Sequence, residues 1–170
     1  MTREEVLEEY SNDYKISEAE VKSINLKEIF DRLNRKYFDE DMEEYLNELE
    51  WSTRLIGAAG NCYKDSGKIR MSVDYHRKYP EQIDRTLCHE MIHLKHKGHG
   101  DGFKSEMNRI NEIAGQEFVR QFSDERAKVN YVCYCPECGR VLLKRSLLKE
   151  SMKNLVHNVC ETDLEWIEVD

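Results

Sequence analysis

Three residues in the middle of the chain, His89, Glu90 and His93, have the types and the spacing of a metal-dependent hydrolytic site. Residues four apart on a helix lie on one face with Cβ atoms about 5–6 Å apart, so both imidazoles are able to bind one Zn²⁺ ion. The Glu90 carboxylate would lie beside the open coordination position. There it takes a proton from zinc-bound water, whose pKa the metal lowers towards 7. The motif predicts a zinc metallopeptidase with Glu90 as general base.

A catalytic zinc site needs a third protein ligand, and the sequence offers His96 and His99. His96 shares the helical face of the first pair, but it lies seven residues beyond His89. That separation is a rise of about 10.5 Å along a helix, too far for one ion. His99 stands between two glycines, Gly98 and Gly100, where the backbone is free to turn back. We therefore predict His99 as the third ligand.

Four of the six cysteines, Cys133, Cys135, Cys138 and Cys160, fall in the last 38 residues. The N-terminus is acidic and has no apolar stretch of the kind that directs export, so a disulfide framework is not expected. Clustered cysteines in such a chain indicate a metal site. With no apolar run long enough to span a membrane, we expect a cytoplasmic protein, or a nuclear one in a eukaryote.

The formal net charge of −8 is unevenly distributed. In residues 1–50 acidic side chains outnumber basic ones about two to one, whereas the C-terminal segment is locally basic. A basic segment is able to attract a polyanion such as DNA, although an ordinary solvated surface is the alternative. The basic side chains concerned are Arg140, Lys144, Arg145, Lys149 and Lys153.

Helices and strands are expected to alternate around the motif. Apolar residues at steps of three and four predict amphipathic helices from Ile24 to about Tyr45, from Pro80 to about Lys97, and from Phe103 to Ala114. Alternating apolar and polar residues predict strands at 51–56 and 68–73, with a short strand near 58–63 between them. The expected fold class is therefore α+β, with helices packed on a small, mostly antiparallel sheet.

Several segments resemble the SprT-like family of zinc metallopeptidases, which includes DNA-dependent proteases. The resemblance covers roughly residues 24–165 and rests on Leu33-Asn34, Tyr37-Phe38, Trp51-Ser52, Gly60-Asn61-Cys62, Ile69-Arg70-Met71-Ser72, Thr86 to His93, and His99 to Phe103. It implies a zincin-like domain, and the histidine of the late His-Gly pair, here His99, as the third zinc ligand. It also implies substrates that are associated with DNA or crosslinked to it. The stretch from His93 to His99 is shorter than in many relatives.

The resemblance further implies a zinc ribbon with two Cys-x-x-Cys knuckles. Cys135 and Cys138 form the first knuckle, while the second would begin at Cys160 and end at Asp163 in place of a cysteine. The missing fourth ligand is Asp163, His157 or Cys133. A second, structural Zn²⁺ ion bound by Cys135, Cys138 and Cys160 is expected, with a metal-free ribbon as the alternative.

Three parts of the chain follow from these patterns. Residues 1–22 form an acidic arm, residues 23–125 a metallopeptidase domain, and residues 126–170 a ribbon-like segment. The predicted function is zinc-dependent cleavage of protein substrates, with DNA contact through the basic C-terminal segment and no membrane partner. The alternative is a non-catalytic zinc protein that binds DNA or a protein, which has no need of a carboxylate beside an open zinc position.

Overall fold

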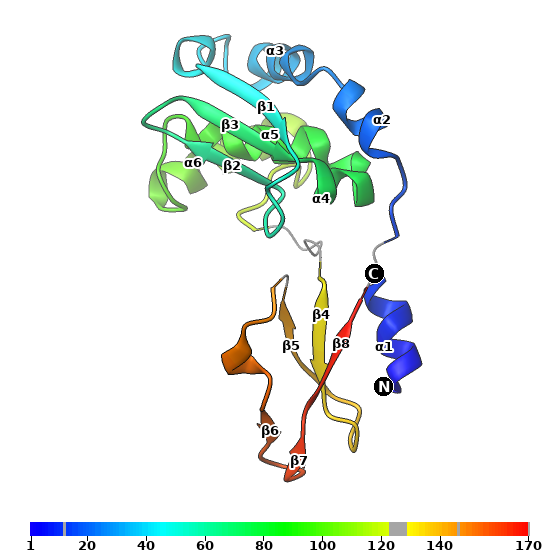
Figure 1. Cartoon of the computed structure of the whole chain (residues 1–170). Helices are drawn as coiled ribbons and strands as arrows, with labels where there is room; N and C mark the ends of the chain where they lie inside the picture. Colours follow the sequence, from blue (N-terminus) through cyan, green and yellow to red (C-terminus); the bar gives the residue numbers. More distant parts are fainter. Residues whose placement is uncertain (12, 123–128, 146, 170) are drawn as a thin grey trace. The chain divides into compact units, whose positions relative to one another are not determined.

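The computed structural model describes residues 1–11, 13–122, 129–145 and 147–169. Two compact units make up the chain (Figure 1). Tyr14–Ala127 form one, called here the central unit, and Met1–Asp13 with Lys128–Asp170 form the other, called the terminal unit. Within the described part of the chain, no helix combines the length and the apolar character that crossing a bilayer requires.

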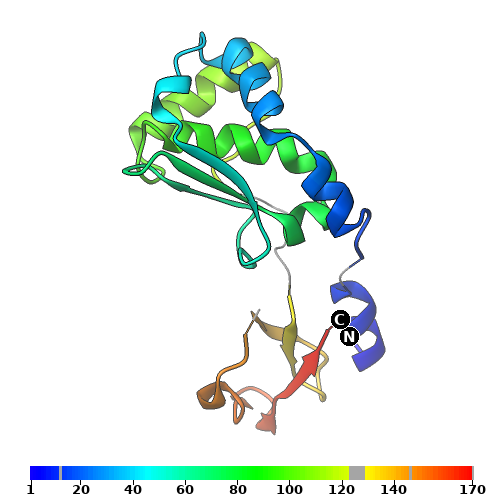
Figure 2. The same ribbon diagram turned by 45° about the horizontal axis from the view of Figure 1, so that its top comes forward.

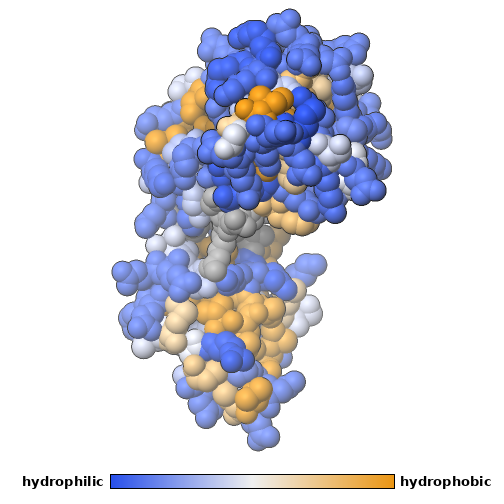
Figure 3. All heavy atoms as spheres, turned by 180° about the vertical axis from the view of Figure 1, so that it is seen from behind, coloured by the Kyte–Doolittle hydropathy of each residue, from blue (hydrophilic) through white to orange (hydrophobic). Residues whose placement is uncertain are grey.

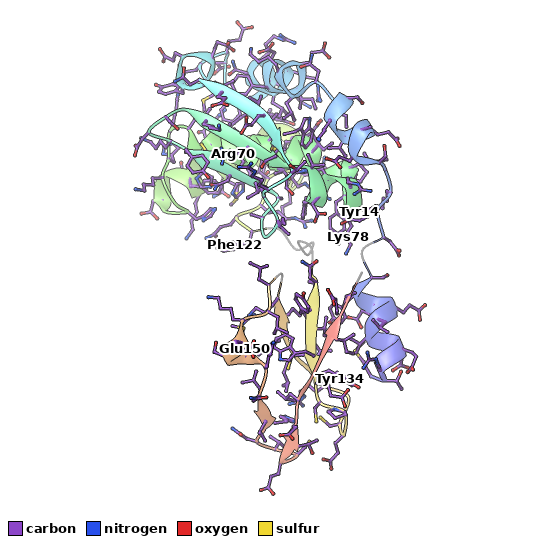
Figure 4. All side chains as sticks on the ribbon, viewed as in Figure 1. Tyr14, Arg70, Lys78, Phe122, Tyr134 and Glu150 are labelled. Carbon is purple, nitrogen blue, oxygen red and sulfur yellow. The ribbon has the colours of Figure 1, made fainter. Side chains whose placement is uncertain are left out.

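The central unit packs helices on one face of a three-stranded sheet (Figures 1 and 2). The buried face of the sheet carries Ile69 and Met71, which join the side chains of the helices in one core. The opposite face is charged, with Arg70 (Figure 4) and Lys68 both paired to Glu50. In chain order the elements are α2 (Glu18–Ser23), α3 (Leu26–Tyr37), η1 (Glu43–Tyr45), β1 (Glu48–Ser52), β2 (Gly60–Tyr63), β3 (Lys68–Ser72), α4 (Val73–Lys78), η2 (Pro80–Gln82), α5 (Ile83–His93) and α6 (Asp101–Ala114).

Helix α5 lies at the centre of this core. Leu87, Cys88 and Met91 are fully buried on it, against Phe30 of α3 and the sheet. These residues are buried together because apolar residues three and four apart line a single face of a helix. The histidines lie on the other face of α5, away from these residues. Burial of the apolar face therefore fixes the position of the histidine motif.

The central sheet is mixed, with one parallel and one antiparallel pair of strands, where a mostly antiparallel sheet was expected. Its order is β1-β3-β2, and β1 runs parallel to β3 while β2 runs antiparallel to it. The chain forms β1 at one edge, then β2 at the other edge, and then β3 between them. As a result β2 is an edge strand, with one side free of strand partners among the described residues. The observed mixture of helices and small sheets is an α+β fold.

The terminal unit is a small β structure with one helix. Strands β5, β4 and β8 form an antiparallel sheet, and β6 pairs with β7. The apolar face of the sheet, with Val132 and Ile167, packs against Val6 and Tyr10 of α1. The elements are α1 (Arg3–Tyr10), β4 (Tyr131–Tyr134), β5 (Val141–Arg145), η3 (Glu150–Met152), β6 (Val156–His157), β7 (Thr162–Asp163) and β8 (Glu165–Glu168).

The expected acidic arm over residues 1–22 is divided between the two units. Helix α1 belongs to the terminal unit, and α2 belongs to the central unit. The reason is that Val6 and Tyr10, four residues apart, form a short apolar stripe that the terminal sheet buries. The expected boundary between residues 125 and 126 lies outside the described residues.

Acid is expected to destabilise the central unit through His76, whose side chain is fully buried. Its Nδ1–H donates to the Ser72 carbonyl (2.7 Å), its Nε2 accepts from the Thr86 hydroxyl (3.1 Å), and burial lowers its pKa from 6.5 to about 4. The neutral ring therefore stabilises the fold above pH 6.5, and this contribution is lost as the pH falls through about 4. The loss is on the order of 3 kcal/mol.

The measurement is chemical unfolding of the wild type and of His76→Gln at about pH 7.5 and about pH 4.5. The variant lacks the titrating ring, so its free energy of unfolding should fall less between the two pH values. Equal losses in both proteins would show that His76 takes up no proton on unfolding in this range.

Candidate metal centres and active site

Three imidazoles converge on one point beside α5. The Nε2 atom of His89 lies 3.1 Å from Nε2 of His93 and 3.2 Å from Nε2 of His99. Nitrogens about 2.0–2.1 Å from a tetrahedral Zn²⁺ ion are about 3.3 Å apart, so the observed spacing fits such an ion. The ligand atoms of these three residues lie within 4.8 Å of one another.

The protonation of the rings favours a cation between them. The Nδ1–H of His89 donates to the Arg120 carbonyl (2.7 Å), and that of His93 donates to the His96 carbonyl (2.9 Å). Each of these two rings therefore directs an Nε2 lone pair at the other, an unfavourable arrangement unless a cation lies between them. Burial lowers the pKa of all three histidines, to about 4 for His89, which favours the neutral form that binds metal.

His99 reaches the pair because the chain turns sharply after α5. Gly98 has φ +68, a conformation that favours glycine, and α6 starts two residues after His99. The side chain of His96 instead lies against Gly102, where a Cβ atom would be 2.6 Å from its Nδ1. The His96 side chain is outside the cluster, and the residue contributes only its backbone carbonyl, which accepts a hydrogen bond from His93.

Phe103 and the backbone of Arg120 also belong to this site, although the sequence indicated Phe103 only as a helix residue within the family resemblance and did not indicate Arg120. The Phe103 ring, on the first turn of α6, lies 4.7–4.9 Å from each of the three imidazoles, measured between ring centroids. It packs the histidines together from one side. A carbonyl acceptor such as that of Arg120 leaves no signal in the sequence, because every residue has one.

Glu90 lies beside the cluster in a nearly closed environment. Its side chain is buried, and burial raises the pKa of its carboxyl group to about 8. Strand β2 passes directly over it, since a Cβ atom at Gly60 would lie 2.9 Å from the Glu90 Cγ atom. Glycine at this position allows the edge strand to approach the carboxylate.

A cleft extends to both sides of the histidine cluster along β2. Gly60, His89, Glu90 and His99 line both halves. The first half, about 340 Å³, continues past Arg85 of α5 towards the exposed ring of Phe122 (Figure 4). The second half, about 610 Å³, follows β2 in the other direction. The cluster is thus open to an extended ligand that lies along the edge strand.

A second cluster lies in the terminal unit and consists of Cys135, Cys138, His157 and Cys160. Their ligand atoms lie within 4.8 Å of one another, with 3.7 Å between Cys138 Sγ and His157 Nδ1. Among the three candidates for the fourth position, His157 is therefore the one brought to the cysteines. Cys133 and Asp163 lie outside the cluster.

The cluster contains His157, one of the three candidates for the fourth ligand, and not Asp163, so His157-x-x-Cys160 stands in the position of a second knuckle. Both knuckles turn in the same way. The Gly139 N–H donates to the Cys135 carbonyl (2.8 Å), and the Glu161 N–H donates to the His157 carbonyl (2.7 Å). Gly139 and Glu161 both have positive φ, +69 and +53. The two-residue spacing from His157 to Cys160 was the signal in the sequence.

The thiols of the first knuckle, Cys135 and Cys138, have lowered pKa values. A backbone N–H directed at the sulfur of Cys135, and another at that of Cys138, lowers the pKa of each thiol. Metal binds the thiolate, so a lower pKa favours binding. The donor set of three sulfurs and one imidazole is one that structural zinc sites use.

The basic residues of the terminal unit do not share one face. Lys144 and Arg145 are neighbours on β5 and point to opposite sides of the sheet. Lys144 lies over the Tyr10 ring (4.8 Å to the centroid), and Lys153 pairs with Glu150 (2.7 Å). One side of the unit is instead largely hydrophobic in Figure 3, and Leu147 and Val159 are 75% and 82% exposed.

Comparison of the sequence with known proteins shows the family of this chain. The DNA-dependent metalloprotease SPRTN of Homo sapiens is 32% identical over 117 residues, which cover 59% of this chain and 24% of that protein. SPRTN of Danio rerio is 35% identical over 94 residues (46% and 15%), and the DNA-dependent metalloprotease dvc-1 of Caenorhabditis elegans is 34% identical over 97 residues (46% and 26%). The chain thus spans about a quarter or less of the length of these relatives. Residues 26–128 match the SprT-like family, and the chain belongs to it.

Proposed function

We propose that the chain is a zinc-dependent endopeptidase with a zincin-like central unit. The observation that carries the proposal is the convergence of His89, His93 and His99 beside a buried carboxylate, Glu90, on an open cleft. A zinc ion held by the three histidines would polarise the scissile carbonyl and acidify a water molecule at its open position. The relatives, which are named metalloproteases, support the same chemistry.

Glu90 is the proposed general base. Its carboxylate takes the proton of the attacking water and then delivers it to the leaving amine. A pKa near the working pH serves both steps, and burial moves the Glu90 pKa in that direction, to about 8. His89 and His93 are oriented by their carbonyl partners, which leaves Nε2 free to bind metal.

The edge strand β2 is the proposed substrate support. A peptide in extended form would add to its free side through main-chain hydrogen bonds. The cleft runs along this strand in both directions from Glu90, so the scissile bond would lie over the cluster. Small side chains from Gly57 to Gly60 allow the peptide backbone to come close.

A second zinc ion is proposed in the terminal unit, bound by Cys135, Cys138, His157 and Cys160. Such a zinc-ribbon site would organise a unit whose core is small. DNA-associated or DNA-crosslinked proteins are the proposed substrates, on the support of the relatives' DNA-dependence. DNA contact is proposed through the basic residues of the terminal unit, of which Lys144 and Arg145 point to opposite sides of the sheet.

The test is incubation of the zinc-loaded protein with a DNA-binding protein as substrate, with DNA and without it. We expect cleavage products that require zinc and that increase when DNA is present. Cleavage that is independent of DNA would support the peptidase and reject the DNA link. No cleavage with both zinc sites filled would favour a non-catalytic zinc protein that binds DNA or a partner.

A further inference from the structure

Arg85 lies one turn before His89 on α5. Residues four apart share a helical face, so the Arg85 side chain is directed to the same side as the histidine cluster. It lines the first half of the cleft together with Gln82 and Thr86, while Glu90 closes the end of that half near the cluster. A ligand group in this half would lie within one helical turn of the reacting centre.

The guanidinium of Arg85 has no partner among the described residues, neither an ion pair nor a hydrogen bond. Its sequence neighbour Asp84 points elsewhere and pairs with Arg32 of α3 (2.9 Å). The other arginine of this half, Arg120, is paired with Glu117 (2.8 Å). Arg85 is therefore a half-buried cation in a concave surface, and in the part of the chain that the structure describes no carboxylate lies within ion-pair distance of it.

The two halves of the cleft differ in charge. The first contains Arg85 and Arg120, and its single described carboxylate is Glu90. The second contains Asp65 with Lys64 and Lys97, so charges of both signs are mixed there. A guanidinium binds a carboxylate through two parallel hydrogen bonds, and the Gln82 and Gln121 amides that line the first half are further donors.

We propose that the first half of the cleft is a carboxylate-binding subsite, in which Arg85 selects an aspartate or glutamate side chain of the substrate next to the scissile bond. This inference rests on the proposed peptidase function and adds a substrate preference to it. The preference is a property of the Arg85 side chain, so reversing its charge should reverse the preference.

Cleavage of a complex peptide mixture, with the products identified by mass spectrometry, measures the preference directly. The zinc-loaded wild type should show acidic residues enriched at one position on one side of the cleaved bonds. Arg85→Gln should lose the enrichment, and Arg85→Glu should replace it by an enrichment of lysine and arginine. Lys97→Glu is the matched control, since it makes the same change of charge in the other half and should keep the acidic enrichment.

Binding to Glu90→Gln gives a readout that needs no activity. Short peptides are compared in pairs that differ by glutamate or glutamine at one position, and the position is moved along the series. One pair should show about tenfold tighter binding of the glutamate form, the value of one charge-assisted hydrogen-bonded pair. The difference should vanish when Arg85→Gln is added, while thermal unfolding and zinc content stay unchanged.

The outcomes separate the two proposals. Equal affinities in every pair, or a difference that survives Arg85→Gln, would overturn the subsite. Absence of cleavage by the wild type combined with the expected binding difference would reject the peptidase function and leave the carboxylate subsite standing. Cleavage without any acidic enrichment would reject the carboxylate subsite and leave the peptidase function standing.

Discussion

Replacing Glu90 by glutamine is expected to abolish peptide hydrolysis while the zinc content stays the same. Glutamine keeps the shape of the side chain but is unable to accept the proton of the attacking water. General-base catalysis of this kind contributes about a thousandfold to the rate. Glu90 is not one of the three clustered ligands. Turnover of a peptide substrate and zinc per chain are the two measurements.

The matched control is Glu112→Gln, which makes the same chemical change at an exposed position of α6. It should leave turnover and zinc content at the wild-type level. If hydrolysis persists in Glu90→Gln, another group acts as the base and the mechanism is wrong. If zinc is lost together with activity, Glu90 is part of the metal site and its role as a base is untenable.

The histidine cluster was accessible from the sequence because most of it is local. Helical geometry alone brings His89 and His93 together, and a limit on reach favours His99 over His96. The contact of Phe103 with the three imidazoles and the role of the Arg120 carbonyl were not predictable. Their contribution depends on how α6 and the segment after it pack on α5, which no local pattern encodes.

Longer-range features explain the other differences. The parallel pairing of β1 with β3 joins strands that are separated by a third one, so alternation within each strand was unable to reveal it. Helix α1 has only Val6 and Tyr10 as buried residues, too weak a stripe to predict its packing on the terminal sheet. The sequence left the fourth ligand open among Asp163, His157 and Cys133, because which of them reaches the three cysteines depends on how the chain folds between the knuckles.

Replacing His157 by alanine is expected to remove zinc from the terminal unit and to unfold that unit. Structural zinc contributes about 10–16 kcal/mol to the folding of small zinc domains. The apolar core of this unit is small, and a three-ligand site binds the ion less tightly. Zinc per chain should fall from about two ions to about one. Hydrogen exchange of the amides in β4 and β8 should accelerate, while that of α5 should not change.

Asp163→Ala distinguishes the observed knuckle from the one that the sequence suggested. Asp163 lies outside the cluster, so this variant should keep both ions and the slow exchange of β4. Because Val6 and Tyr10 of α1 pack on the same sheet, His157→Ala should also speed the exchange of α1, although that helix lies at the other end of the chain. Loss of zinc in Asp163→Ala, with zinc retained in His157→Ala, would reverse the assignment. Retention of α1 protection after zinc loss would show that helix and sheet hold together without the metal.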